Sequence, residues 1–224
     1  MIARKLRTAS LLDAMATVGA GGAAELAALS GIGEAATRAR LRGLAAEGFV
    51  GASRVLHGEP ALYALTRRGL LSAGRAELDP VVVGASNAAH LAAVARVAVV
   101  LAGEGHRLTG ERELRAWERA AGRALASAEV GWARDGSVAL HRPDLVCLGD
   151  GLPVAIEVEL TVKAPERLGR IVRGWARSRV VAGAVYHAAP AAMRAVERAI
   201  DAELAGERVR VVALRSTSSD PSAL

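Results

Sequence analysis

The sequence predicts an α/β protein with two units, a mainly helical unit followed by a larger mixed α/β unit. Amphipathic helical patterns fill residues 4–47 and are followed by a strand–turn–strand pattern at residues 49–66. Asp79-Pro80 marks a boundary, and from about residue 108 apolar strand patterns alternate with helical ones. A chain of 224 residues with 52% hydrophobic residues is long enough to form two modest domains.

The first unit contains three predicted helices and a hairpin. Leu11, Leu12 and Met15 form one apolar stripe on a helix at residues 4–19, and a short helix at residues 23–29 follows a glycine run. A third helix, at residues 34–47, ends at Gly48. Strands at residues 49–55 and 61–66 flank a turn at residues 57–60, and a short helix is expected at residues 70–78. Three helices followed by a hairpin is the order of a winged helix.

Four segments of this unit resemble the winged helix-turn-helix proteins of bacterial regulators. They are Glu25-Leu26-Ala27-Ala28-Leu29-Ser30-Gly31, Arg40-Leu41-Arg42-Gly43-Leu44, Glu47-Gly48-Phe49-Val50 and Leu62-Tyr63-Ala64-Leu65-Thr66-Arg67-Arg68-Gly69. The resemblance implies that the third helix enters the major groove of double-stranded DNA and that the wing contacts phosphates.

Arginines of this unit are the candidate DNA-binding residues. Arg38 and Arg42 lie four residues apart on the helix face opposite the buried leucines, and Arg40 flanks that face. Arg54, Arg67 and Arg68 are candidate phosphate contacts of the wing. A net charge of +6 and a pI near 10.5 favour a polyanionic partner. The alternative is a solvated arginine face on a winged helix that binds protein.

Residues 81–104 are expected to form a helical connector that packs against both domains or forms a homodimer interface. This window contains Asn87, His90 and Arg96, which make it too polar for a membrane span, so a cytoplasmic protein without membrane contact is expected. Cys147 is the only cysteine, which fits a reducing compartment. Residues 216–224 are expected to be a disordered tail.

The second unit is expected to start near residue 108, with Thr109 capping a helix that carries Glu111 and Glu113. Strands are expected at residues 128–134, 144–148, 154–160, 180–187 and 208–214, and helices at residues 165–178 and 191–204. Arginines at 167, 170, 173 and 177 form a basic stripe on the first of these helices, facing either a DNA backbone or Glu166 and solvent. The element order is α-β-β-β-α-β-α-β.

Acids inside two apolar strands are the strongest candidate site. Glu157 and Glu159 are two residues apart and therefore share a strand face, and a hairpin through Gly149-Asp150-Gly151 would bring Asp144 near Glu157. Gathered carboxylates raise each other's pKa unless a cation lies between them, and a divalent metal is the expected cation. Lys163 is one of only two lysines among 29 basic residues. It is either a lysine whose amine has a function at the site or a solvated residue at the end of a strand.

A helix with glutamates, then Pro143-Asp144, then Glu157-Val158-Glu159 resembles the PD-(D/E)XK nuclease superfamily over residues 108–214. Joined to the winged helix, this arrangement is most similar to the replication-relaxation family of plasmids and mobile elements. The resemblance implies a winged helix domain at residues 1–80, the connector at 81–104 and a mixed α/β, restriction-endonuclease-like domain at 105–215.

The resemblance also implies roles for the acids. Asp144 and Glu157 match the metal-binding acids, which would hold Mg²⁺, and Glu111 or Glu113 matches the supporting helix glutamate. Glu159 stands where the family motif has lysine, so Lys163 or Glu159 would orient the attacking water if the protein is active. Three readings follow: a DNA-binding protein with a non-catalytic nuclease fold, an active Mg²⁺-dependent endonuclease or nickase, or a transcriptional regulator with a dimerising or ligand-sensing second domain.

Overall fold

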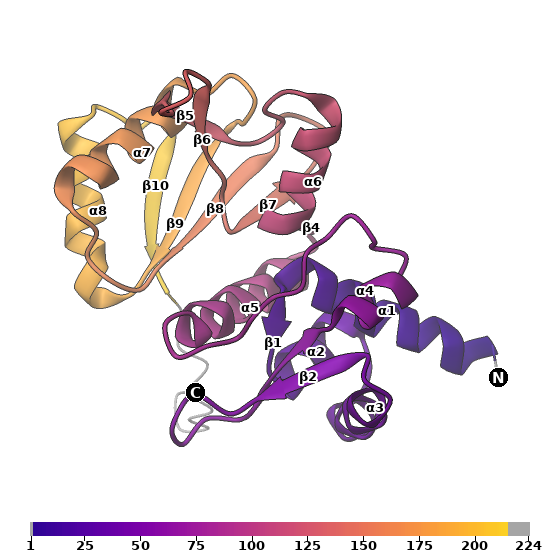
Figure 1. Cartoon of the computed structure of the whole chain (residues 1–224). Helices are drawn as coiled ribbons and strands as arrows, with labels where there is room; N and C mark the ends of the chain where they lie inside the picture. The colour runs from indigo at the N-terminus through magenta and orange to yellow at the C-terminus, as the bar shows by residue number, and fades with distance from the viewer. Residues whose placement is uncertain (1, 215–224) are drawn as a thin grey trace.

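The computed structural model describes residues 2–214, with side chains from Ser10 onward, as a mixed α/β protein (Figure 1). The expected tail at 216–224 lies outside this range. The first half contains α1 (Ile2–Val18), β1 (Ala20–Gly21), α2 (Ala23–Ser30), α3 (Glu34–Ala46), β2 (Val50–Ser53), β3 (Leu62–Leu65) and α4 (Arg67–Ser72).

These strands form an antiparallel sheet in the order β1-β3-β2. The short strand β1 was not predicted, because its glycine-rich sequence has no strand pattern; it forms by pairing with Tyr63 and Ala64 of β3. The helix expected at residues 70–78 instead begins at Arg67, where the Thr66 hydroxyl accepts a hydrogen bond from Gly69 N (3.1 Å). It ends at Ser72, and Gly74 follows with a left-handed φ of 70°.

The second half contains α5 (Ala88–Gly103), β4 (Arg107–Gly110), α6 (Glu111–Ala121), β5 (Ala128–Trp132), β6 (Val138–His141), β7 (Leu145–Leu148), β8 (Val154–Glu159), α7 (Pro165–Arg177), β9 (Gly183–Ala188), α8 (Pro190–Ala202) and β10 (Val209–Ala213). Five strands form a mixed sheet in the order β10-β9-β8-β7-β4. The contacts of β8 with β9 and of β9 with β10 are parallel, and the others are antiparallel. Strands β5 and β6 form a separate hairpin.

Two features differ from the expected order. Thr109 does not cap α6, because it lies in β4 and is buried; Gly110 is the N-cap, and its N–H donates to the Glu113 carboxylate (3.1 Å). Strand β6 adds a fourth strand between α6 and α7, where three were expected. Strands β4 and β6 are each four residues long, which is too short for a periodic sequence pattern to be distinctive.

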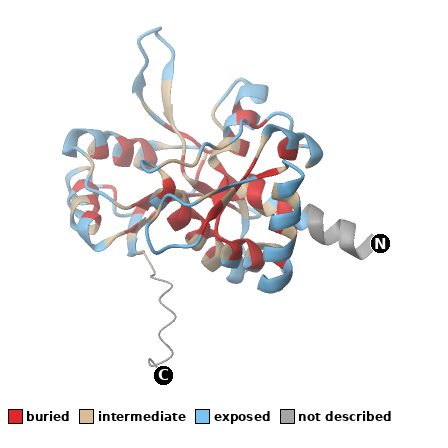
Figure 2. Cartoon of the chain, turned by 60° about the horizontal axis from the view of Figure 1, so that its bottom comes forward, coloured by how far each residue is buried: buried red, intermediate tan, exposed pale blue. Residues whose placement is uncertain are grey.

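The sheet carries hydrophobic side chains on both faces. Val146 and Ala155 pack with Trp175 of α7, whereas Leu145 and Ile156 belong to a cluster with α5, α1 and α2. Figure 1 shows α7 and α8 on one side of the sheet and α5 between the sheet and the N-terminal helices. In Figure 2 the buried residues lie in the strands and on the helix faces that pack against them.

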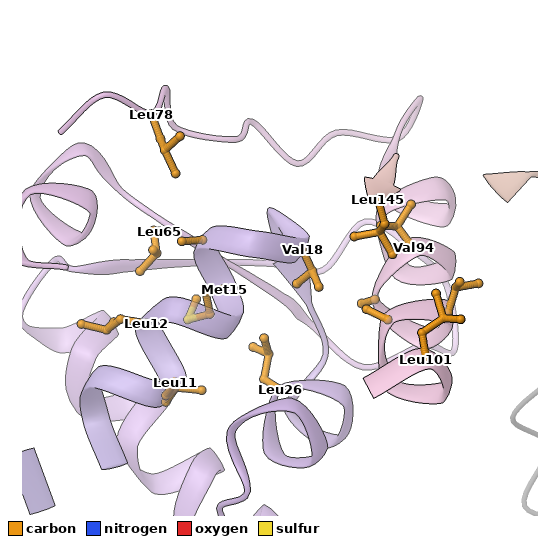
Figure 3. Close-up of a cluster of buried hydrophobic side chains, with 14 of the residues drawn as sticks. Leu11, Leu12, Met15, Val18, Leu26, Leu65, Leu78, Val94, Leu101 and Leu145 are labelled. Atoms are coloured by element: carbon orange, nitrogen blue, oxygen red, sulfur yellow. The ribbon is translucent and has the colours of Figure 1, made fainter. Parts of the chain in front are cut away.

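Helix α5 links the two halves through a continuous core. In Figure 3, Val94 of α5 lies beside Leu145 of β7, and the same cluster extends to Met15 of α1 and Leu26 of α2. Within residues 2–214, no helix has the length and apolarity that crossing a bilayer requires.

Candidate functional site

The three strand acids lie at one edge of the sheet, where β7 begins and β8 ends. Leu145 of β7 pairs with Ile156 of β8, so the antiparallel register places Asp144 opposite Glu157, as the hairpin prediction required. Glu157 and Glu159 alternate with Val158 and point to the α7 side of the sheet. Both are buried, with 5% and 4% of their surface exposed. Their burial means that their charges must be compensated by nearby groups.

Asp144 immediately precedes β7, and its side chain, rather than its backbone, hydrogen-bonds to the backbone of β8. Its Oδ2 accepts a hydrogen bond from the backbone N–H of Val158 (2.7 Å). Its Oδ1 lies 2.8 Å from Nε2 of His90, on α5. The Asp144 carboxylate is therefore shared between the β8 backbone and the helix that covers the opposite face from Glu157 and Glu159.

Glu157 has two partners on a single carboxylate oxygen. Its Oε1 lies 2.7 Å from Nε2 of His141 and accepts a hydrogen bond from the indole N–H of Trp175 (3.1 Å). The rings of His141 and Trp175 meet edge to face, with centroids 5.8 Å apart. Trp175 is fully buried, so it packs and holds Glu157 rather than presenting an indole to a ligand.

Lys163 forms an ion pair with Glu159. Its positive charge also lowers the pKa of His90, His141 and Glu157, which places its amine among all of these groups. The lysine that composition singled out is thus part of the site. The acid–base cluster, as we call it, consists of Asp144, Glu157 and Glu159 with His90, His141 and Lys163.

Proton affinities in the cluster are raised. The hydrogen bond to Asp144 raises the pKa of His90 above its ordinary value, against the effect of burial. Burial lowers the pKa of His141, but the hydrogen bond and charge of Glu157 outweigh it, so the net shift is upward. Burial also raises the pKa of Glu157, with a further contribution from the Asp144 charge. Each imidazole therefore binds a proton more tightly than a free imidazole, because a carboxylate lies against it.

The cluster places one lysine and two histidines of raised pKa beside the three acids. The sequence predicted a divalent metal among these acids; in the structure, side chains of the chain itself contact their carboxylates. A Mg²⁺ ion bound to Asp144 and Glu157 would compete with His90, His141, Trp175 and the Val158 N–H for the same oxygens. Among the described residues, no three His, Cys, Asp or Glu side chains are grouped so that they could hold a metal ion.

The glutamates of α6 have partners outside the cluster. Glu111 pairs with Arg115 on its own helix, and only its backbone N–H reaches Asp144, whose carbonyl accepts it (3.2 Å). Glu113 caps Gly110 and pairs with Arg75 (3.2 Å). The structure therefore brings neither Glu111 nor Glu113 into contact with the side chains of the strand acids.

Two histidines of the cluster were not predicted as site residues. His141 stands three residues before Asp144, and its place at the end of a strand beside the acids was a usable signal. His90 lies 54 positions before Asp144, and no sequence pattern connects the two.

The predicted DNA-binding arginines fall into two groups. Arg67 donates to the carbonyls of Ala76 and Leu78 (2.9 and 3.0 Å), and Arg68 donates to the Glu47 carbonyl (2.8 Å) and stacks over Phe49. These contacts hold the turns around α4. In contrast, Arg38 and Arg42 of α3 and Arg54, which directly follows β2, are exposed.

Those three arginines and Arg96 of α5 line one groove of about 520 Å³. We call this the arginine groove. Glu25, Glu34 and Glu59 also line it, and Glu34 forms an ion pair with Arg38. Arg40 does not line the groove, and its buried Nη1 has no hydrogen-bond partner among the described residues. The groove thus joins α3, the β2–β3 connection and α5, and its lining has four arginines against three glutamates.

No protein-family model matches the sequence, and a search of curated proteins found no match.

Proposed function

We propose that the chain is a DNA-binding protein of the plasmid or mobile-element replication-relaxation type, with a winged helix at residues 1–80 and a nuclease-like, non-catalytic domain at residues 105–215. The arginine groove carries the proposal. Its arginines come from α3, the wing and α5, and guanidinium groups are suited to phosphate oxygens because their planar donors bind two oxygens at once. Homodimer formation and a cytoplasmic location remain predictions.

The non-catalytic part of the proposal rests on the acid–base cluster. Asp144 already has partners on both oxygens, and Glu157 is held by His141 and Trp175. A buried carboxylate whose charge is compensated inside the protein needs no ligand to balance it, and removing one of its partners would leave the charge uncompensated. The same acids that would hold a catalytic ion therefore have a sufficient structural role.

Duplex binding is tested with the Arg38→Ala/Arg42→Ala variant. If both arginines contact phosphates, the variant binds a DNA duplex more weakly, and the slope of log K against log salt becomes shallower by about 1.8. Fluorescence anisotropy over a salt series measures both quantities. Arg194→Ala/Arg198→Ala on α8 is the matched control because it removes equal charge from two exposed positions outside the groove. Equal affinity and slope in the groove variant and the wild type would rule out this surface.

An Mg²⁺-dependent endonuclease or nickase is the second candidate, favoured by the direct register pairing of Asp144 with Glu157. Calorimetric titration with Mn²⁺ and plasmid nicking with Mg²⁺ or Mn²⁺ test it, with Asp144→Ala as the control. Our proposal expects no nicking above that of Asp144→Ala. Metal-dependent nicking that Asp144→Ala abolishes would establish the endonuclease instead.

A further inference from the structure

A second hollow, of about 450 Å³, lies between the β5–β6 hairpin and the C-terminal end of α7, far along the chain from the arginine groove. Figure 1 shows this hairpin beside α7. Its lining includes Ser127 and Trp132 from the hairpin side, and Arg177 and Arg179 from the end of α7. We call it the tryptophan hollow. The acid–base cluster contributes no residue to its lining.

Trp132 presents its indole to solvent in this hollow. It is 77% exposed, whereas Trp175 of the same domain is fully buried. A bulge between Glu129 and Trp132 interrupts the pairing of β5 with β6, and bulges of this kind redirect the side chain that follows. An indole combines a large apolar ring with a polar N–H, which is why tryptophan is enriched where one molecule covers another.

Two arginines without an ion pair to any described residue line the same hollow as Trp132. Arg177 and Arg179 are both exposed, and neither forms an ion pair with another described residue, whereas Arg173 on the same helix pairs with Glu203 (2.6 Å). Glu129 is the one acid in the lining, so the lining has two positive charges against one negative charge. The hollow therefore favours an anionic ligand.

A buried hydroxyl in the same lining also lacks a partner. Ser127 is 1% exposed, and its Oγ forms no hydrogen bond with any described residue. Buried polar atoms of this kind are rare, because leaving them unpaired costs free energy that a hydrogen bond would recover. A ligand that enters the hollow and carries a donor or an acceptor would satisfy the Ser127 hydroxyl.

We propose that the tryptophan hollow binds single-stranded DNA, with one unstacked base on Trp132, a base-edge hydrogen bond to Ser127, and phosphates at Arg177 and Arg179. An aromatic face beside cations is the combination that binds single strands, since every base can stack and every nucleotide carries a phosphate. The proposal shares with the proposed function only the assumption that nucleic acid is the partner, and it uses a different surface.

The test measures anisotropy of a labelled oligothymidylate of about 12 nucleotides with the full chain. We expect Trp132→Ala to raise Kd about tenfold or more, and Trp132→Phe to retain most of the affinity. Arg177→Ala/Arg179→Ala should weaken binding and make the salt slope shallower by roughly 1.4, as expected for two single-strand phosphates. In a Trp117→Phe background, the oligonucleotide should quench the fluorescence of Trp132.

Matched controls separate this site from general effects. Trp117→Ala removes another exposed indole, on α6, and Arg194→Ala/Arg198→Ala removes two exposed arginines from α8, outside the hollow. Neither should change oligothymidylate affinity. Arg38→Ala/Arg42→Ala should weaken duplex binding alone, so a failure of the proposed function and a failure of this inference give different results. Thermal melting verifies that each variant is folded.

Two outcomes would overturn the inference. One is an unchanged oligothymidylate affinity in Trp132→Ala together with unquenched Trp132 fluorescence. The other is a concentration-dependent dimer in sedimentation that Trp132→Ala dissociates without any effect on oligothymidylate binding, which would assign the hollow to a second copy of the chain.

Discussion

Glu157 is buried beneath α7, and among the described residues its side-chain hydrogen-bond partners are His141 and Trp175, of which His141 can carry a positive charge. Removing one partner of such a pair leaves a buried charge without compensation, which costs more than the pair contributes. We expect His141→Phe to lower the free energy of unfolding by on the order of 3 kcal/mol. The Glu157→Gln/His141→Phe double variant should recover part of this loss, and urea denaturation measures both. A double variant no more stable than His141→Phe would show that Glu157 is not the cause.

The raised pKa values of His90 and His141 also predict how stability depends on pH. A histidine with a raised pKa binds its proton more tightly in the folded state, so its stabilisation is present below its unfolded pKa of 6.5 and is lost as pH rises through the folded value. The pKa of Glu157 is also raised, so this group likewise contributes stability that is lost as pH rises above its unfolded pKa of 4.5.

We therefore expect the melting temperature to fall as pH rises from about 6 to 8 in the presence of a chelator. The groups that face these imidazoles are Asp144, Glu157, Glu159 and Lys163. His90→Gln/His141→Gln should flatten the profile, because an amide can donate to the same carboxylates but does not titrate. His57→Gln, on the exposed wing, should leave the profile as it is. A wild-type melting temperature that rises over this range would contradict the prediction.

At the scale of elements, the junction of β4 with α6 rests against α1 through Gly110. A Cβ atom built on Gly110 would lie 1.8 Å from the carbonyl oxygen of Thr17, so only glycine allows this approach. The junction also sets the start of α6, whose first turn is held by the Glu113 cap and by Arg75. The contact between α1 and the second half therefore depends on a residue with no side chain.

Gly110→Ala should destabilise the protein by about 3 kcal/mol, because the clash is with backbone that cannot move aside. Gly103→Ala, where a Cβ meets nothing within 4 Å, is the control and should not be destabilising. Chemical denaturation compares the two variants. Equal stabilities of the two variants would show that α1 and β4 separate at little cost.

At the scale of the whole molecule, one hydrophobic cluster runs from Leu11 of α1 through Val94 of α5 to Val158 of β8. The two predicted units therefore share a core, and α5 is a part of it rather than a flexible linker. Unfolding either half would expose apolar surface on the other.

We expect a single cooperative thermal transition, with the calorimetric enthalpy equal to the van't Hoff enthalpy. Val94→Ala should shift the whole transition to lower temperature, since it removes buried methyl groups at the contact with Leu145. Val82→Ala, at a largely exposed position, is the control. Two separate transitions, or a Val94→Ala effect on only one of them, would show that the halves fold independently.

Local rules were sufficient for much of the second half. A hairpin turn at Gly149-Asp150-Gly151 predicted that Asp144 lies near Glu157, and the β7–β8 register places them opposite each other. Pro165 and Pro190 lie at the helix starts, where their fixed φ is accommodated. These features depend on residues near one another in the chain.

The partners of the acids were decided only by the tertiary structure. His90 reaches Asp144 from α5, Trp175 reaches Glu157 from α7, and Glu113 turns to Arg75 of the first half. Charge compensation depends on distance in space, and no local pattern encodes the contact of two elements far apart in sequence. The sequence by itself therefore determined that the acids of two neighbouring strands meet, and the packing of α5 and α7 on the sheet decided which side chains hydrogen-bond to them.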